Sequence, residues 1–230
     1  MDPTTTAVHE VLAVVLQVRE GELRALLWKR AREPFSGLWA LPGGVLGGEE
    51  TLERSIRRHL AAKVDVREVA HLEQLTTLSD PERHPARRQI GTAYLGLVPL
   101  GLDPEVPDDT AWRAVDPLPE LAFDHRSIVL AGRARLRAKL SYTNVGFALA
   151  PPEFTLSELR ALYAAALGHE VSTTNLQRVL LRRGALEDTG ERRPPGRAGG
   201  RPASVFRFRS RSLEVTDPFA VLRPPAGQAV

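Results

Sequence analysis

The sequence predicts an α+β protein with two domains, an α/β/α sandwich followed by a smaller helical module. Two apolar strands joined by Glu20-Gly21-Glu22, and then a helix at 50–64 with an apolar residue at every fourth position, predict the sandwich. Two capped helices and a basic hairpin predict the module. The 230 residues have room for one large and one small domain, which we place at 1–150 and 151–230.

Composition excludes several classes of protein. The chain has no cysteine, which rules out disulfides and thiolate metal sites. It has neither a run of about 18 apolar residues nor a secretory signal pattern, so we expect a cytoplasmic protein without a membrane partner. Charge is uneven, with ten arginines and three acids within 174–212, a local net charge of +7. This excess favours a polyanionic partner.

The strands of the first domain follow from apolar runs that end at turn residues. Val8 to Val18 has no breaker and is expected to be buried on both faces, with Leu23 to Lys29 as its hairpin partner. Further strands are predicted at 69–78, 90–97 and 112–115, with a polar loop at 79–88. A second helix is expected from Asp124 to Leu140, and Phe147-Ala148-Leu149 is expected to be extended before two prolines.

A glycine-rich turn, Trp39-Ala40-Leu41-Pro42-Gly43-Gly44, leads into the helix at 50–64. Glycines allow close backbone approach, and a helix N-terminus favours phosphate, so this turn could hold a phosphate-bearing ligand. The same residues also fit a plain strand–turn–helix connection in which Trp39 packs in the core.

The second domain begins with a capping box, Thr155-Leu156-Ser157-Glu158, and its first helix should end at Gly168. A second helix is expected from Ser172 or Thr173 through Arg183. An Arg/Gly/Pro loop at 189–202 and an alternating strand at 204–209 complete a hairpin that is typical of the wing in a winged helix-turn-helix. No structure is assigned to 217–230.

The second of these helices would present polar side chains to the major groove of double-stranded DNA, where Asn and Gln suit adenine and Arg suits guanine. A polar outer face is also what any surface helix has. The candidate DNA-binding residues lie on this helix and at the tip of the hairpin: Thr173, Thr174, Asn175, Gln177, Arg178, Arg182, Arg197 and Arg201.

The spacing around the glycine-rich turn resembles the Nudix box. Five residues separate Gly44 from Glu50, and seven more separate Glu50 from Arg58, as in that family. Members that hydrolyse pyrophosphates use glutamates on this helix to bind Mg²⁺ or Mn²⁺. Three of the glutamate positions hold His59, Ala62 and Lys63, and the family's glycine is Asp65. We therefore predict a box that keeps its shape, with no catalytic residue and no metal ligand.

Taken together, the chain is similar over residues 8–210 to the NrtR type of Nudix-related transcriptional regulators. The similar segments are 34–44, 80–88 with Ala93-Tyr94, 123–126, 154–159 and 200–203. The resemblance implies a homodimeric repressor of NAD biosynthesis or salvage genes. It also implies that the repressor binds a palindromic operator, that ADP-ribose or a related nucleotide releases it, and that no cofactor is required. The recognition helix departs from the family's usual Asn-Phe-Arg-Arg-Lys, with Asn175-Leu176-Gln177-Arg178-Val179 in its place.

The predicted effector site combines the turn with nearby arginines, because guanidinium groups bind pyrophosphate oxygens in a bidentate manner. Two alternatives remain open. One is an active ADP-ribose or nucleoside-diphosphate-sugar pyrophosphatase that uses Glu49, Glu50 and Glu53, and the other is a regulator that responds to a sugar. The candidate ligand-binding residues are Arg30, Trp39, Gly43, Gly44, Glu50, Arg58, Arg87 and Arg88.

Overall fold

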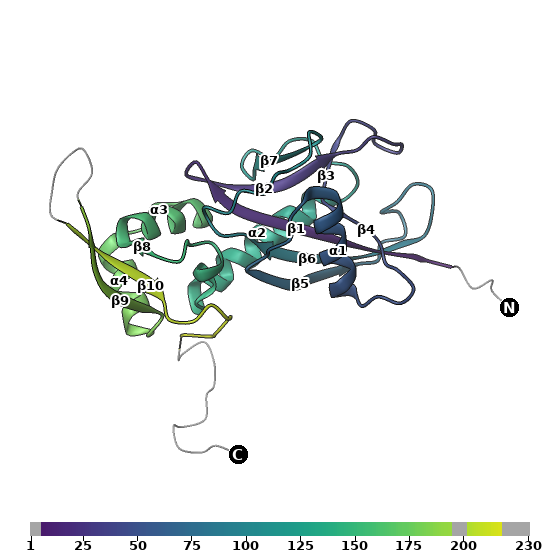
Figure 1. Cartoon of the computed structure of the whole chain (residues 1–230). Helices are drawn as coiled ribbons and strands as arrows, with labels where there is room; N and C mark the ends of the chain where they lie inside the picture. Colours follow the sequence, from purple (N-terminus) through teal and green to yellow (C-terminus); the bar gives the residue numbers. More distant parts are fainter. Residues whose placement is uncertain (1–5, 195–201, 218–230) are drawn as a thin grey trace, which may run out of the picture. The chain divides into compact units, whose positions relative to one another are not determined.

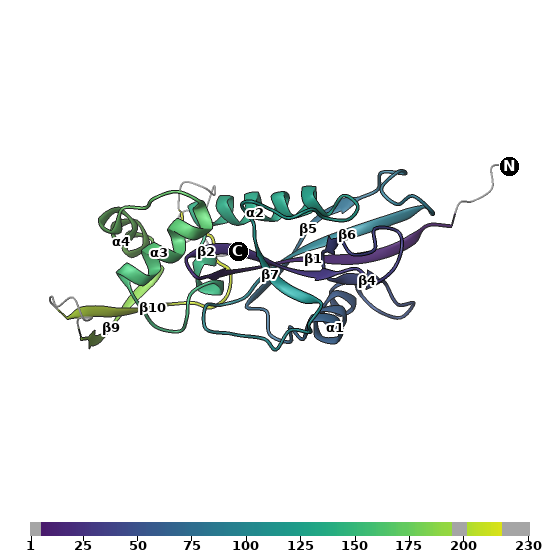
Figure 2. The same cartoon turned by 90° about the horizontal axis from the view of Figure 1, so that it is seen from above.

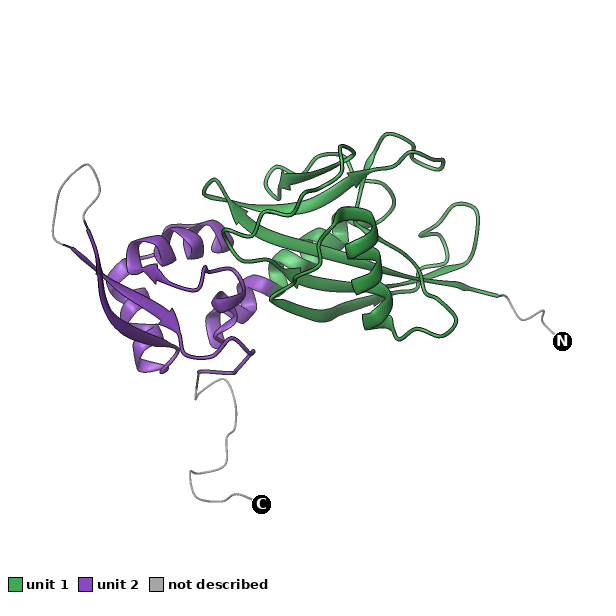
Figure 3. Cartoon of the chain, viewed as in Figure 1, with its two compact units in different colours: residues 1–135 green, residues 136–230 purple. Residues whose placement is uncertain are grey.

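The computed structural model describes residues 6–194 and 202–217 (Figure 1). The chain forms two compact units, residues 1–135 and 136–230 (Figure 3). The division falls inside helix α2 (His125–Tyr142), so one helix belongs to both units. A functional boundary at residue 150 stays a prediction. Within the described ranges, no helix is long and apolar enough to cross a membrane.

Unit 1 is built on a seven-stranded sheet with the order β3-β2-β1-β6-β5, in which β4 also pairs with β1 and β7 with β2. Among the described strands, β1 and β6 run parallel and the other pairs run antiparallel. The strands are β1 (Val8–Arg19), β2 (Glu22–Lys29), β3 (Trp39–Ala40), β4 (Gly43–Val45), β5 (His71–Leu78), β6 (Gln89–Leu97) and β7 (Thr110–Ala114).

Strand β1 lies at the centre of this unit, with residues 11–18 buried as predicted. Alternate side chains point to opposite faces of a strand. Val11, Ala13 and Val15 belong to the core cluster that includes the apolar face of α1 (Leu52–Val64). Val14 faces α2, where a Cβ at Gly132 would come within 2.9 Å of its side chain. Figures 1 and 2 show α1 and α2 on opposite faces of the sheet, which confirms the α/β/α sandwich.

Helix α1 begins and ends at residues suited to those positions. The Thr51 hydroxyl accepts a hydrogen bond from the Arg54 backbone N–H at 3.2 Å, which caps the N-terminus. The C-terminal cap is Asp65, which adopts a left-handed conformation with φ of 51°. Aspartate tolerates this conformation better than most residues, so the turn persists without the family's glycine.

Unit 2 contains the predicted helix-turn-helix and hairpin. Its helices are α3 (Leu156–Leu167) and α4 (Thr173–Arg182), and its sheet has the order β8-β10-β9, with β8 at Phe154–Thr155, β9 at Leu186–Arg193 and β10 at Ala203–Phe208. The capping box is confirmed: Glu158 accepts from the Thr155 N–H at 2.7 Å, and Thr155 accepts from the Glu158 N–H at 3.3 Å. Ser172 caps α4.

Three sequence-based expectations are wrong. Residues 147–149 are not extended, because the turn hydrogen bonds of a 3₁₀ helix, η1 (Val145–Ala148), hold this segment. The loop expected from 189 starts later, because β9 pairs with β10 as far as Arg193. The glycine-rich turn also contains two short strands, since β3 pairs with β2 and β4 with β1.

Candidate functional sites

A pocket of about 170 Å³ lies in unit 1, where β1, β2, β4 and the end of α1 come together. Four of the predicted ligand-binding residues line it: Arg30, Gly43, Gly44 and Arg87. The two glycines are needed for packing. A Cβ at Gly43 would collide with the carbonyl oxygen of Val11, and one at Gly44 would collide with the imidazole of His59. The turn thus lines the pocket through these two glycines, and their approach to the phosphates of a ligand stays a prediction.

Trp39 is not among the residues that line the pocket. In the β2–β3 register Trp39 pairs with Lys29, whereas Ala40 pairs with Trp28. Neighbouring positions face opposite sides of a sheet, so Trp28 and Ala40 face the pocket and Trp39 faces away. The Trp39 ring packs instead against Lys29 and Arg113, with ring-to-cation distances of 5.3 and 4.4 Å.

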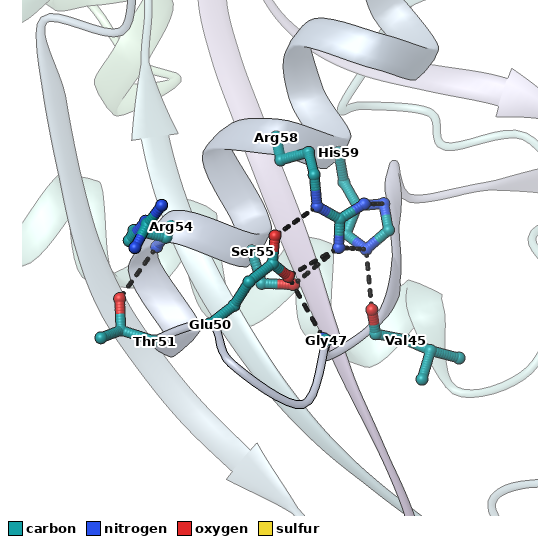
Figure 4. A network of polar contacts seen from close by, with 8 residues as sticks. All are labelled: Val45, Gly47, Glu50, Thr51, Arg54, Ser55, Arg58 and His59. Atoms are coloured by element: carbon teal, nitrogen blue, oxygen red, sulfur yellow. Dashed lines mark hydrogen bonds and ion pairs between the residues drawn. The ribbon is translucent and has the colours of Figure 1, made fainter.

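Glu50 and Arg58 are paired with each other (Figure 4), and neither residue lines the pocket. Arg58 Nη2 donates to Glu50 Oε2 at 2.7 Å, and the Gly47 N–H donates to the same oxygen at 3.2 Å. These bonds attach the glycine loop to α1, and the hydrogen bonds from Arg58 lower the pKa of Glu50 to about 2. Arg88 also lies outside the lining, and it donates to the Ser79 carbonyl at 2.7 Å.

An aromatic cluster from the segments 80–88 and 123–126, which the sequence analysis noted without assigning them a ligand contact, forms another side of the pocket. Phe123 stacks on His84, with ring centroids 5.3 Å apart, and the Arg30 guanidinium lies over the Phe123 ring at 4.7 Å. His125 is fully buried, and its Nδ1 accepts the Leu41 N–H at 3.0 Å. Burial lowers the pKa of His125 to about 3, so the imidazole is neutral and can accept this bond.

A buried ionic network connects this cluster with β1 and the start of α2. The Arg83 side chain donates to Glu10 at 2.8 Å and to both carboxylate oxygens of Asp124 at 3.0 Å. Arg83 is 8% exposed. Glu10 lines the pocket, whereas Asp124 directly precedes α2, so the network joins the pocket to the helix that both units share.

The residues at the former glutamate positions do not fit a divalent metal ion. His59 is buried, and its Nε2 lies 3.0 Å from the Val45 carbonyl oxygen (Figure 4). Lys63 donates a hydrogen bond to the Gly43 carbonyl at 2.6 Å. Burial lowers the pKa of His59. In the part of the chain that the structure describes, no three His, Asp or Glu side chains are grouped as metal ligands. Glu50 and Glu53 are instead paired with Arg58 and Arg57.

Helix α4 presents a polar face outward. Leu176 and Leu180 are buried against unit 2, whereas Thr174, Asn175, Arg178 and Arg182 are exposed and Thr173 and Gln177 are half-buried. Arg178 Nη2 donates to Asn175 Oδ1 at 2.8 Å, which orients both side chains near the helix N-terminus. Within the described residues, neither Arg178 nor Arg182 forms an ion pair, so both remain available to a polyanion.

The β9–β10 hairpin carries arginines that are largely paired with acids. Arg193 contacts Glu158 at 2.6 Å and Arg207 contacts Glu187 at 3.1 Å. The positive charge counted from the sequence is therefore partly neutralised on the described part of the hairpin. The predicted contacts Arg197 and Arg201 lie outside the described residues.

Comparison with known proteins agrees with this architecture. Residues 8–131 match the family model of the NUDIX domain, and residues 146–208 match that of the NrtR DNA-binding winged helix domain. The fold and sites thus define a Nudix-domain protein with a winged-helix DNA-binding domain.

The chain belongs to the NrtR family. It is 30% identical to the ADPR responsive transcriptional repressor NtrR of Acinetobacter baylyi, over 84% of this chain and 79% of that protein. It is similar to Shewanella oneidensis NrtR complexed with a 27mer DNA, with 31% identity, 86% and 92% of the two chains covered and a TM-score of 0.73. The NUDIX domain of Shewanella oneidensis NrtR complexed with ADP ribose is 31% identical, with a TM-score of 0.52 over 59% of this chain and 94% of that one.

Proposed function

We propose that this protein is a transcriptional repressor of NAD biosynthesis or salvage genes, and that ADP-ribose or a related nucleotide releases it from its operator. The relatives support this, because the Acinetobacter baylyi protein is named as ADPR-responsive and the Shewanella oneidensis protein binds DNA and ADP ribose. The observation that carries the proposal is the pocket, in which Arg30, Lys63 and Arg87 face a single acid, Glu10. Such a lining suits a diphosphate.

The repressor acts as a homodimer on a palindromic operator. A winged helix places one recognition helix in one major groove, so two copies of α4 about 34–36 Å apart would contact two half-sites. Thr174, Asn175 and Arg178 are the exposed residues nearest the N-terminus of α4, where contacts to base edges are made.

The Nudix domain binds the nucleotide without hydrolysing it. An active pyrophosphatase would need metal-binding carboxylates on α1, whereas Glu50 and Glu53 are held by arginines. Purified protein with ADP-ribose and excess Mg²⁺ should give turnover equal to that of buffer. A kcat of about 1 s⁻¹ or more, as ordinary enzymes show, would favour the enzyme over the non-hydrolysing repressor.

An electrophoretic mobility-shift experiment tests the proposal as a whole. The probe is the promoter region of the NAD genes in the source genome, and the titrants are ADP-ribose and, as a control, ribose 5-phosphate. We expect a shifted protein–DNA complex that ADP-ribose dissociates and that ribose 5-phosphate leaves intact. A complex released only by the sugar phosphate would favour a sugar-responsive regulator, and absence of any shift would contradict DNA recognition at these genes.

A further inference from the structure

The C-terminal half of α1 holds two nitrogen side chains where hydrolases of this fold hold carboxylates. His59 and Lys63 are four residues apart, so they lie on one face of the helix, and both contact carbonyl oxygens of β4. The Lys63 side chain thus places a positive charge beside Gly43 and Gly44, where the carboxylates of a hydrolase would instead bind a metal cation. A divalent cation would be repelled there.

The charges around the pocket have the sign that attracts an anion. Three cations, Arg30, Lys63 and Arg87, line it, and the acid among the lining residues, Glu10, is already bonded to the buried Arg83. Within the described residues, none of these three cations forms an ion pair. Lys63 donates to a carbonyl oxygen and Arg87 to the Gln89 side-chain amide oxygen at 2.9 Å, both of which are neutral acceptors.

Lys63 also stands where two hollows meet. The pocket of about 170 Å³ and an adjacent hollow of about 330 Å³ share Trp28, Arg30 and Lys63 as lining residues. The Lys63 ammonium lies 5.1 Å from the centre of the Trp28 ring, which holds it at this junction. A ligand with two bulky ends joined by a diphosphate would fill both hollows and bring its diphosphate to the shared cations.

We propose that the Lys63 ammonium takes the place of the divalent cation of Nudix hydrolases and binds the diphosphate of the effector directly, together with Arg30, so that the effector binds without metal. This inference rests on the proposed function for the identity of the effector. It names Lys63 as a residue that binds the diphosphate group itself, and predicts that a diphosphate joined to two larger groups binds more tightly than inorganic pyrophosphate, because the larger groups fill both hollows.

The protonation of Lys63 supplies a readout that a purely structural role would not give. Removal of water lowers the pKa of Lys63, Glu10 raises it, and Arg30 and Arg58 lower it. A bound diphosphate favours the charged form and raises this pKa. Effector binding should therefore take up a proton at pH values between the lowered pKa of Lys63 in the free protein and its higher pKa in the complex, and the affinity should fall as pH rises through this interval.

The experiment is isothermal titration calorimetry of the full chain with two probes, ADP-ribose and inorganic pyrophosphate, each in excess EDTA and in excess Mg²⁺. For the wild type we expect dissociation constants for ADP-ribose that agree within about twofold between EDTA and Mg²⁺; pyrophosphate is compared between variants in EDTA, because it chelates Mg²⁺ itself. Lys63→Met should weaken both probes by about 10–100-fold in EDTA, the loss expected for one charge-assisted hydrogen bond. Lys63→Arg should retain most of the affinity.

The control variant is Arg57→Met, which removes a cation from an exposed position of the same helix that lines neither hollow. It should bind both probes as the wild type does. Operator binding and the thermal midpoint of each variant verify that it is folded. If the Lys63→Met variant is unfolded, the Lys63→Gln variant is measured in its place, because its side-chain amide keeps a hydrogen-bond donor without the charge.

The outcomes separate the two proposals. Pyrophosphate binding that depends on Lys63 in EDTA, without binding of ADP-ribose, would overturn the proposed effector and support the metal-free site. Binding of either probe that requires Mg²⁺, or Lys63→Met and Lys63→Gln binding as tightly as the wild type, would overturn the role of Lys63. Absence of binding by both probes would overturn both proposals.

Discussion

His125 shows how one buried side chain connects the pocket to pH. It accepts the Leu41 N–H at 3.0 Å, next to the glycines of β4, and can do so only while its imidazole is neutral. Burial lowers its pKa to about 3, whereas the unfolded chain binds the proton near the ordinary value of 6.5. Acid therefore favours unfolding through this residue, because the unfolded state takes up a proton that the folded state does not.

The free energy of unfolding should accordingly rise with pH between about 3 and 6.5, and the contribution of His125 from pH 5 to 6.5 is about 2 kcal/mol. Urea unfolding at both pH values measures this difference. His125→Gln, which keeps an oxygen acceptor for Leu41, should show a pH dependence smaller by that amount. The control is His169→Gln, which changes an exposed histidine. If the free energy of unfolding of His125→Gln changed with pH as much as that of the wild type, the neutral buried imidazole would be contradicted.

Single residues differ in how far the sequence predicts their role. The prediction that His59, Ala62 and Lys63 stand where metal ligands are expected rests on the resemblance to the Nudix box, which local spacing reveals, and a helix fixes which of these positions share a face. The tryptophan of the pocket does not follow from spacing. Whether Trp28 or Trp39 faces the pocket depends on the β2–β3 register and on the Trp28 Nε1–H bond to the Leu41 carbonyl, which are contacts between separate segments.

At the scale of secondary-structure elements, helices α3 and α4 show what local sequence signals can predict. Both could be predicted, because the capping residues Thr155 and Ser172 and the glycines that follow the helices are local signals. The segment at 145–150 could not. Its apolar residues fit a strand, but hydrogen bonds back to Asn144 and Gly146 make it a 3₁₀ helix whose residues are buried. Tertiary burial here decides between two local structures that the sequence pattern allows equally.

The exposed face of α4 leads to a prediction about DNA recognition. Arg178→Ala should weaken operator binding by about 1–3 kcal/mol if this side chain reads a base edge, with a smaller effect on unrelated DNA. Fluorescence anisotropy with labelled operator and scrambled duplexes measures both affinities.

The matched control for Arg178→Ala is Arg54→Ala, which removes the same charge from an exposed position of α1 in unit 1. It should bind operator as the wild type does. Equal losses on the operator and the scrambled duplex would assign Arg178 to the DNA backbone instead of a base.

At the scale of the whole molecule, α2 is the helix that belongs to both compact units. It runs from His125 to Tyr142, and the division between the two units falls between Arg135 and Leu136. Its N-terminal end is attached through Asp124 to Arg83 and hence to Glu10 in the pocket. We propose that ligand binding in the pocket affects the DNA-binding winged helix through α2.

A ligand can release the repressor only if it binds the DNA-free arrangement more tightly than the DNA-bound one. Operator DNA must then weaken ligand binding by the same factor by which the ligand weakens DNA binding, typically about 5–150-fold. The most direct measurement titrates ADP-ribose into the free protein and into protein saturated with operator. We expect the dissociation constant for ADP-ribose to be higher in the presence of operator by that factor. Equal dissociation constants in the two titrations would contradict the assignment of ADP-ribose as the effector.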